Sequence, residues 1–439
     1  MLINQCSEAF KQDRAWKTGR DLAFGALACM GRHTLTGMLT ASGQQFMDWS
    51  SAYRLFSHQR VDTSKLFDVV RSGVLQELGS QQMIVAHMDD TILKKTGRNI
   101  PGTAWRRDPL GPHFQTNFIW GQRFLQISIA LPDHQGCCQS RAIPIDFHHS
   151  PTVKKPRKAD GEPVWKNYRE QQRKLRLSKQ GSERLKQLRS SLDTLIGRIR
   201  KDTKLYLSPE GQPDLGRKRV YGERLPTPEQ VRQSDQYTWK EVNAWAAGKE
   251  HKFNVKVIKN TRWRSAGQKH NLQLVVIRPL GYRLTKSSKV LYREPAYLVC
   301  TDNDLSVEDL LQAYLWRWEI EVNFREEKTL LGCGQAQVRN PESAERVPAF
   351  ISAIYAILHL AAYRSLKQSN HILLPRPKWY QRKEGKRHST GDIINNLKAQ
   401  AWAKNTGMNF SGFVNHELKS QNQRNVVNPC TSAMFYMRN

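Results

Sequence analysis

The stretch MIVAHMDDT, residues 83–91, is an apolar run that stops at two aspartates and a threonine. A short apolar run bounded by polar residues is typical of a buried β-strand. Two further β-like runs follow, NFIWGQRFLQISIALP at 117–132 and RAIPIDF at 141–147. Three successive strands with short connections predict an antiparallel meander, and this sheet decides the fold.

Residues 1–78, ahead of the meander, show a helical pattern. The segments DLAFGALACM and LFDVVRSGVLQEL carry apolar residues at spacings of three and four. Ser64 is a candidate N-cap for the second of these helices. We therefore expect a helical N-terminal domain, whose function the pattern does not reveal.

A strongly basic segment follows the meander. Residues 151–204 hold 17 Lys and Arg against 6 Asp and Glu, a net charge of +11 in 54 residues. Within it, VWKNYREQQRKLRLSKQGSERLKQLRSSLD predicts one long basic helix. A charge run of one sign is either a solvated face or a contact for phosphate backbones, and both interpretations stay open.

The next part of the chain, residues 205–300, is β-rich, with strands expected at 252–258, 271–277 and 295–302. TRWRSAGQKH, between two of these strands, mixes tryptophan with basic residues, as nucleic-acid contacts and plain surface hairpins both do. Ser306 is a candidate N-cap where the chain returns to helix. The apolar run at 350–363 is too short to span a bilayer and predicts a buried helix.

The whole-chain composition indicates a partner and a compartment. Lys and Arg outnumber Asp and Glu by 69 to 39, a formal net charge of +30, which would attract nucleic acid. The seven cysteines form no CxxC pair, which favours reduced thiols in a cytoplasmic protein. The start MLINQCSEAF lacks a charged stretch followed by an apolar run, so we expect neither secretion nor a membrane partner.

The helix expected at YLWRWEIEVNFREEK, residues 314–328, carries polar side chains at regular intervals. Each residue advances about 100° around a helix, so Tyr314, Arg317, Glu321 and Lys328 fall within roughly 60° of one another. The simpler interpretation is a set of ion pairs on a surface helix. A carboxylate beside cations on a partly buried helix also suits a metal ligand with phosphate-binding neighbours.

Asp89 and Asp90 are the candidate partners of Glu321. Side chains alternate along a strand, so only one of the two aspartates should point into a shared site. An aspartate on a central strand and a glutamate on a late helix can together hold two Mg²⁺ ions, which activate a nucleophile for attack on phosphorus.

The spacing Tyr314-x2-Arg317-x3-Glu321-x6-Lys328 resembles the Y-R-E-K signature of bacterial insertion-sequence transposases with a DDE active site. Other segments resemble the same family: HMDDTILKKTG, RAIPIDF, LIGRIRKDTKLY, RWRSAG, PAYLVCTD and LLGCGQAQVRNP. The resemblance runs from about residue 80 to 365, with a weaker match to a helical N-terminal domain. It implies an α/β fold: an RNase H-like mixed sheet with flanking helices and a β-rich insertion before the last catalytic helix.

The resemblance also implies a division of the chain into five parts. These are a helical N-terminal domain (1–78) that can contact DNA, the first part of the catalytic core (79–204), the β-rich insertion (205–300), the last part of the core (301–365) and a basic C-terminal region (366–439).

The family's site residues carry over position by position. Asp89 would be the first metal-binding carboxylate, with Asp90 in its place if the register differs by one, and Glu321 would be the last. Tyr314, Arg317 and Lys328 would hold backbone phosphates of DNA. The implied cofactor is Mg²⁺ or Mn²⁺. The implied partners are double-stranded DNA, as terminal inverted repeats and target, and a second copy in a synaptic homodimer, in a bacterial, nucleoid-associated setting.

One feature departs from the family. A second aspartate, on a strand followed by a helix, is expected after the long basic helix, but LRSSLD runs directly into TLIGRIRKDTKLY. Either the chain is an internally deleted, inactive transposase that still binds DNA, or the TLIGRIR strand fills the vacant position and Asp202 or Asp193 becomes the ligand.

The expected function is therefore a DNA transposase that cleaves and transfers strands at terminal inverted repeats, with activity in doubt through loss of the second aspartate. The alternatives are a non-catalytic DNA-binding remnant or domesticated protein, and an RNA- or structure-selective nuclease on the same fold.

Overall fold

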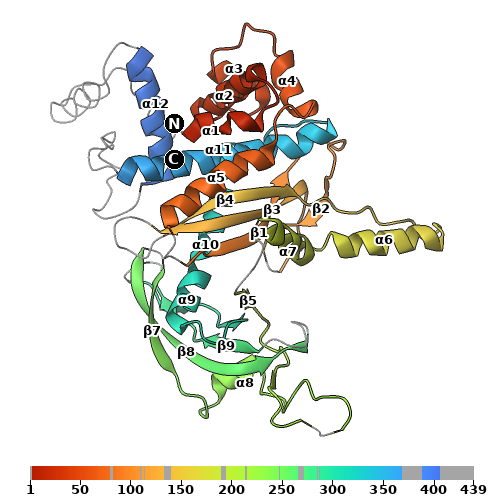
Figure 1. Cartoon of the computed structure of the whole chain (residues 1–439), viewed down its shortest axis with the longest axis vertical. Coiled ribbons are helices and arrows are strands. Elements are labelled where there is room, and N and C mark those ends of the chain that lie inside the picture. The colour runs from red at the N-terminus through yellow and green to blue at the C-terminus, as the bar shows by residue number, and fades with distance from the viewer. Residues whose placement is uncertain are drawn as a thin grey trace, which may run out of the picture. The chain divides into compact units, whose positions relative to one another are not determined.

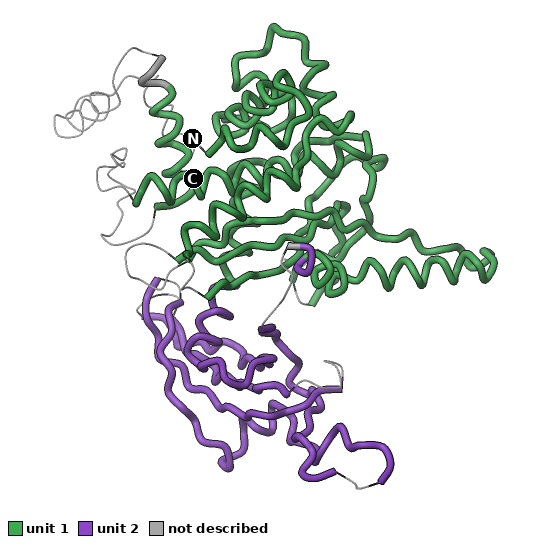
Figure 2. Tube along the Cα trace, in the orientation of Figure 1, with its two compact units in different colours: residues 1–136, 140–184, 318–439 green, residues 137–139, 185–317 purple. Residues whose placement is uncertain are grey.

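The structure is a computed structural model of the 439-residue chain. It describes the whole chain except residues 1, 80–82, 109–110, 113, 133–139, 189–193, 213–214, 247, 265–270, 284, 286, 368–387 and 406–439. Two compact units are distinguished in Figure 2. Unit 1 comprises residues 1–136, 140–184 and 318–439, and unit 2 comprises residues 137–139 and 185–317. Unit 1 is thus discontinuous in sequence.

The sheet of unit 1 is the predicted antiparallel meander. Its strands are β1 (Ala86–Lys94), β2 (Ala104–Arg107), β3 (Phe118–Pro132) and β4 (Ser140–His149). The long strand β3 lies in the middle, with β1 on one side and β4 and β2 on the other. All of these pairings are antiparallel. The described strands therefore form an α/β protein with antiparallel sheets and lack the parallel pairing expected of a mixed sheet.

Strand β1 differs from its prediction in register. The sequence placed the end of the strand at Asp89, Asp90 and Thr91, but the strand continues to Lys94 and pairs with β3 along its whole length. Thr91 and Leu93, beyond the two aspartates, are buried. The two aspartates thus lie inside the strand. The residues after them keep the alternation of buried and less buried side chains, and β3 pairs with them.

Helices of unit 1 precede and surround this sheet (Figure 1). Those of the N-terminal region are α1 (Leu2–Gln5), α2 (Asp13–Ala28), α3 (Leu35–Ala41), α4 (Ser50–Ser57) and α5 (Thr63–Leu78), with a 3-10 turn at Cys6–Ala9. Helix α5 begins two residues earlier than predicted. Its N-cap is Asp62, whose Oδ1 accepts from the amides of Ser64 and Lys65, so the prediction of Ser64 as the cap was wrong.

The C-terminal part of unit 1 supplies α10 (Trp318–Thr329), α11 (Pro341–Lys367) and α12 (Thr390–Asn405). Helix α11 contains the predicted buried helix at 350–363 and is buried almost continuously from Ser343 to Leu360. It is long and apolar enough to cross a membrane by length and composition, but 67% of its most apolar window is buried inside the protein. It packs against β4 and α5 and forms the core of unit 1.

The predicted long basic helix is two helices, α6 (Glu162–Lys174) and α7 (Leu177–Leu188). The break follows Leu175, where the backbone leaves helical geometry. Tertiary contacts explain why the chain turns here. Gly181 of α7 lies against the sulfur of Met88 on β1, and Arg184 pairs with Asp146 on β4, which hold α7 on the sheet. Helix α6 has no buried residue and projects from the rest of unit 1 in Figure 1.

Unit 2 is built on a second antiparallel sheet. Its strands are β5 (Ile196–Arg198), β6 (Tyr206–Leu207), β7 (Lys240–Ala246), β8 (Lys249–Arg262), β9 (Leu272–Ile277) and β12 (Ala296–Cys300), in the order β5-β12-β9-β8-β6, with β7 also paired to β8. A small hairpin is formed by β10 (Gly281–Tyr282) and β11 (Leu291–Tyr292), and the helices are α8 (Pro228–Gln233) and α9 (Val307–Trp316).

The strands predicted at 252–258, 271–277 and 295–302 are present in this unit as β8, β9 and β12. Helix α9 is capped as predicted, since the Ser306 side chain accepts from the Asp309 amide at 3.0 Å. Every residue of β9 is buried, because aliphatic clusters cover both faces of the sheet.

Candidate functional site

Asp89 and Asp90 lie on opposite faces of the unit 1 sheet. In the β1–β3 register Asp89 is opposite Gln126 and Asp90 is opposite Leu125. Opposed residues of an antiparallel pair share a face and neighbours along a strand alternate. The two carboxylates therefore point to different helices. The main chain adds one link between them, since the Asp90 amide donates to Asp89 Oδ1 at 2.9 Å.

The Asp89 face is covered by the segment that leaves α10 and by α11. Leu93, two alternations along β1 from Asp89, lies against Gly334. Gln122, on the same face of β3, donates to the carbonyl of Ala344 in α11 at 3.3 Å. Lys95, just beyond β1, is buried and donates to the carbonyls of Gly334 and Ala336 at 2.8 and 2.9 Å. Asp89 thus shares its face with the connection that follows the candidate glutamate helix.

The Asp90 face is covered by α7 and carries cations. Met88, on this face, contacts Gly181 of α7. Burial raises the pKa of Asp90, and Arg123 and Arg106 act in the opposite direction. Arg123 is itself held by the Ser150 hydroxyl at 3.1 Å. A carboxylate between two guanidinium groups has little free negative potential to offer a divalent cation.

Helix α10 packs against β1 and β4 and carries Glu321 and Lys328. Its position is fixed by Asn323, which is buried and donates to the carbonyl of Ala142 on β4 at 2.8 Å. Glu321 and Lys328 are seven residues apart and share one face of the helix. Both are partly buried, and the Lys328 ammonium lies 6.0 Å from the Phe324 ring.

Two other glutamates of α10 are structural. Glu326 accepts from the hydroxyls of Tyr355 in α11 and Thr390 in α12, at 2.7 and 2.5 Å. Glu327 is buried and accepts from the Ser352 hydroxyl at 2.8 Å. Burial raises the pKa of Glu327 to about 8, so it is protonated at neutral pH. Glu326 and Glu327 lie about 140° and 240° around the helix from Glu321, so these contacts anchor α10 by the side roughly opposite Glu321.

The four-residue signature is divided between two helices. The sequence predicted one helix over 314–328, but α9 ends at Trp316 and α10 begins at Trp318, with Arg317 as the turn residue between them. The Arg317 amide donates to Tyr314 at 3.2 Å, the tighter pattern of a 3-10 turn. Tyr314 and Arg317 belong to unit 2, where Tyr314 packs on the aliphatic core. Glu321 and Lys328 belong to unit 1.

The structure does not supply the expected second acid among the described residues. Strand β1 pairs with β3 alone in this part of the chain, so it is an edge of the sheet. The predicted strand at TLIGRIR is β5, which pairs with β12 in unit 2 and does not fill the vacant position. Asp202 is 60% exposed in its side chain and pairs with Arg200 at 3.0 Å. Asp193 lies outside the described residues.

A pair of metal ions needs several oxygen ligands and an acid shared between them. Among the residues that the structure describes, no group of three or more His, Cys, Asp or Glu side chains converges as a metal site would require. The described donors therefore do not fit a two-metal centre.

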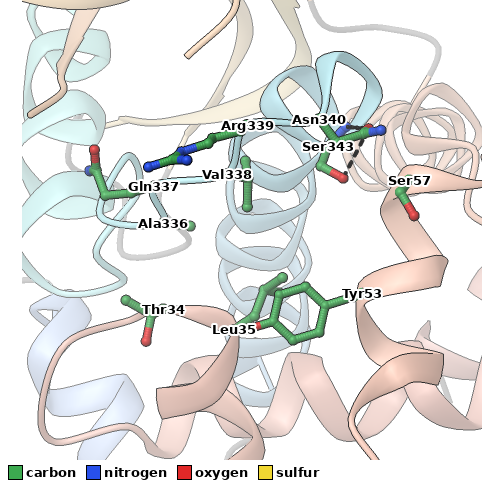
Figure 3. A pocket seen from close by; sticks show the side chains of 10 residues that line it. All are labelled: Thr34, Leu35, Tyr53, Ser57, Ala336, Gln337, Val338, Arg339, Asn340 and Ser343. Atoms are coloured by element: carbon green, nitrogen blue, oxygen red, sulfur yellow. Dashed lines mark hydrogen bonds between the residues drawn. The ribbon is translucent and has the colours of Figure 1, made fainter. Parts of the chain in front are cut away.

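A pocket of about 410 Å³ lies elsewhere in unit 1 and is shown in Figure 3. It is formed between Thr34, Leu35, Tyr53 and Ser57 of the N-terminal helices and the segment 336–343. Asn340 accepts from the Ser343 amide at 3.0 Å at one side of it. None of the described residues that line this pocket is an aspartate or a glutamate.

Sequence reasoning did not find the cations beside Asp90 or a cluster formed by Arg98, Trp105 and Trp120. The guanidinium carbon of Arg98 lies 4.7 Å from the Trp105 ring centre and 4.9 Å from the Trp120 ring centre. The only signal was compositional: two tryptophans and several arginines between residues 98 and 123.

Comparison with known proteins gives one finding on function. A family model described as "DDE superfamily endonuclease" matches residues 6–169, which include helices α2 to α5, the meander and Asp89. No curated protein matches the chain. The match supports a DDE-type transposase or nuclease family, a transposase-like nuclease activity and DNA as the substrate. Nucleases of this superfamily generally use divalent metal ions. The match ends before Glu321.

Proposed function

We propose that this protein is a DNA-binding protein of the DDE transposase type that acts at the terminal inverted repeats of an insertion sequence. In this proposal Asp89 and Glu321 remain from a cleavage site that lacks its middle acid. The observation that carries it is the length of chain between α7 and β5. Residues 189–195 join Leu188 to Ile196, and seven residues are too few for a strand followed by a helix.

The choice of Asp89 over Asp90 follows from the sheet. Asp89 lies on the face covered by the segment after α10, whereas Asp90 faces α7 and two arginines. An acid that shares its face with the connection after the glutamate helix can serve the same phosphate. Without the acid that bridges two metal ions, the separation of the ions is not fixed and cleavage should be lost or very weak.

The basic arm, defined as residues 154–186, supports DNA binding. It holds 12 Lys and Arg against 4 Asp and Glu, a net charge of +8. Helix α6 in this arm buries no residue, so its cations are available to a partner. An open groove of about 500 Å³ is lined by Arg173, Arg176, Ser178, Lys179 and Ser182. Three cations and two hydroxyls suit the phosphates of a DNA backbone.

Tyr314, Arg317 and Lys328 are proposed to hold phosphates near the DNA end. A guanidinium and an ammonium are the usual phosphate partners in proteins. Burial lowers the pKa of Lys328, with Asp108 among the acids that oppose this effect. Bringing two DNA ends together requires at least two copies of the chain, so the DNA-bound form is proposed to be a homodimer.

The test is to incubate the full-length protein with DNA that carries the terminal repeats of its element, in Mg²⁺ and separately in Mn²⁺. We expect retention of the DNA in a mobility-shift assay and no nicking with either ion. Nicking that disappears in Asp89→Ala and in Glu321→Ala would overturn the incomplete site and establish an active transposase. Nicking of DNA without the repeats would indicate a structure-selective nuclease. Absence of binding would overturn the whole proposal.

The basic arm has its own test. Changing Arg173, Arg176 and Lys179 together to alanine should weaken duplex binding and reduce the slope of log affinity against log salt by about 2 to 3, because each lost phosphate contact removes about one released counterion. The matched control changes three exposed lysines of unit 2, Lys240, Lys249 and Lys259. An equal loss in the control would show that general charge, not the arm, binds the duplex.

A further inference from the structure

A two-stranded ribbon in unit 1 exposes aromatic side chains on one face. The ribbon is β2 with the first residues of β3, and its register pairs Trp105 with Trp120 and Arg107 with Phe118. Opposed residues share a face, and so do residues two apart on one strand. Trp105, Arg107, Phe118 and Trp120 therefore lie on the same face, which is called the aromatic face below.

The aromatic face is unusually open to solvent. Trp105 is 56% exposed and Phe118 is 61% exposed. Large aromatic side chains are normally buried because each removes a large apolar area from water. Two exposed aromatic side chains on one face of the ribbon therefore indicate a binding surface.

The aromatic face is also held rigid. The Trp120 indole nitrogen donates to the Gly97 carbonyl at 3.1 Å. The two tryptophan rings meet edge to face with centroids 5.6 Å apart, and the Arg98 guanidinium lies over both rings. Such stacking fixes Trp105 although much of it faces solvent. A ligand that stacks on this face would therefore bind with little loss of side-chain conformational entropy.

The charge around the aromatic face selects the ligand. Arg98 and Arg107 are exposed beside the rings. Asp108 follows Arg107 and interacts with Lys328 of α10, which brings this end of the ribbon within electrostatic reach of a proposed phosphate-binding residue. Aromatic rings between guanidinium groups suit unpaired nucleotides, whose bases stack and whose phosphates pair with arginine.

We infer that the aromatic face binds an unpaired stretch of DNA strand by stacking bases on Trp105 and Phe118. The inference rests on the proposed function for the identity of the polymer. Paired bases in a duplex offer no free faces to such a surface, so it should discriminate single-stranded from double-stranded DNA.

The experiment measures the affinity of the full-length protein for a fluorescent oligo-dT and for a duplex of equal length by polarisation. Trp105→Ala and Phe118→Ala should each weaken oligo-dT binding about 10-fold, because stacking of one base is worth roughly that much. Duplex affinity should change less than about twofold, since duplex binding is assigned to the basic arm. Trp105→Phe should retain most of the oligo-dT affinity, because it keeps an aromatic ring.

The matched control is Tyr292→Ala, which removes an aromatic residue that is 72% exposed in unit 2. It should leave both affinities unchanged. Circular dichroism on each variant separates loss of the surface from loss of the fold.

The remaining outcomes overturn the inference. Unchanged oligo-dT binding in the Trp105→Ala, Phe118→Ala double variant would show that bases do not stack there, while retained duplex binding would leave the proposed function standing. Loss of dimer in sedimentation, together with unchanged oligo-dT affinity, would make the face a contact between two copies. If the wild-type protein binds neither the oligo-dT nor the duplex, the proposed function is overturned, and this inference with it.

Discussion

The sheets of the two units bury different kinds of side chain. In unit 2, β9 is Leu-Gln-Leu-Val-Val-Ile and aliphatic clusters pack on both of its faces. In unit 1, the three long strands bury more polar residues, at positions His87, Thr91, Gln122, Gln126, Ser128, Ser140 and Asp146, whereas the long strands of unit 2 bury Lys256, Thr261 and Gln273. Buried polar groups cost free energy unless they are hydrogen-bonded. The unit 1 sheet therefore depends more on the helices and loops that satisfy these groups, whereas the unit 2 sheet depends more on apolar packing.

This comparison predicts the largest effect for an apolar truncation in unit 2. Leu298 on β12 is fully buried in one of the aliphatic clusters. Leu298→Ala should lower the free energy of unfolding of unit 2 by roughly 3 kcal/mol through lost transfer energy and a cavity. Hydrogen exchange resolved by segment is the measurement. Equal loss of protection in β3 and β4 would show that the units do not unfold separately.

A substitution that raises the free energy of unfolding is expected at Glu327 in unit 1. Its pKa is about 8 in the folded protein against 4.5 as the ordinary value, so the folded state holds a proton that the unfolded state releases. The wild-type protein therefore loses stability as pH rises from 4.5 to 8 and reaches a constant value above 8. Glu327→Gln keeps a partner for Ser352 without this loss.

The expected gain for Glu327→Gln is on the order of 2 kcal/mol at pH 8 and near zero at pH 4.5. Thermal melting of both proteins from pH 4.5 to 9 measures it. The control is Glu308→Gln at an exposed glutamate of α9, where the difference from wild type should not widen with pH. A constant gap for Glu327→Gln would contradict the protonated state assigned to Glu327.

Loss of the ion pair that holds α7 on the unit 1 sheet should have an effect of about the same size, in the destabilising direction. The Arg184 guanidinium nitrogen Nε donates to Asp146 Oδ2 at 2.8 Å, and Asp146 is buried. Arg184→Ala should destabilise unit 1 by about 2 kcal/mol, because a buried carboxylate loses its partner. Asp146→Asn in the same background should restore part of the loss, as urea unfolding would show. Further loss in the double variant would contradict this explanation.

The smallest loss in the free energy of unfolding is expected for a polar group of unit 2. Thr261 on β8 is fully buried and its hydroxyl donates to the Leu272 carbonyl at 3.0 Å. Thr261→Val keeps the shape and removes the bond, so it should cost about 1 kcal/mol in urea unfolding. A loss as large as that of Leu298→Ala would mean that unit 2 depends on polar contacts as unit 1 does.

The difference between the sheets also explains what the sequence could predict. The strands β3, β8, β9 and β12 were predicted from long apolar runs, which favour a strand wherever it packs. The end of β1 was misplaced because the acids at Asp89 and Asp90 were taken as a boundary, although β3 pairs beyond them. Two helix breaks, at Leu175 and Arg317, were missed because local propensity continues through both and tertiary contacts decide the turn.

The candidate site was predictable in its residue types and not in its arrangement. The alternation of side chains along a strand predicted that Asp89 and Asp90 point to opposite faces of the sheet. Only the topology shows which face carries the connection after α10. The seven residues between α7 and β5 could be counted in the sequence. The partner that TLIGRIR takes in unit 2 is a long-range pairing, and local pattern does not encode it.

The division of unit 1 into segments on either side of unit 2 bears on how the chain folds during synthesis. Residues 185–317 form an uninterrupted block that can close as soon as it leaves the ribosome. The meander is made earlier, yet α11 and the segment before it, which cover one of its faces, belong to the last 122 residues of the chain. Until then Leu93 and Phe124 remain exposed to water. The nascent chain therefore passes through a long interval in which apolar surface is exposed. Synonymous codons that slow translation after residue 184 should lengthen that interval and increase chaperone demand.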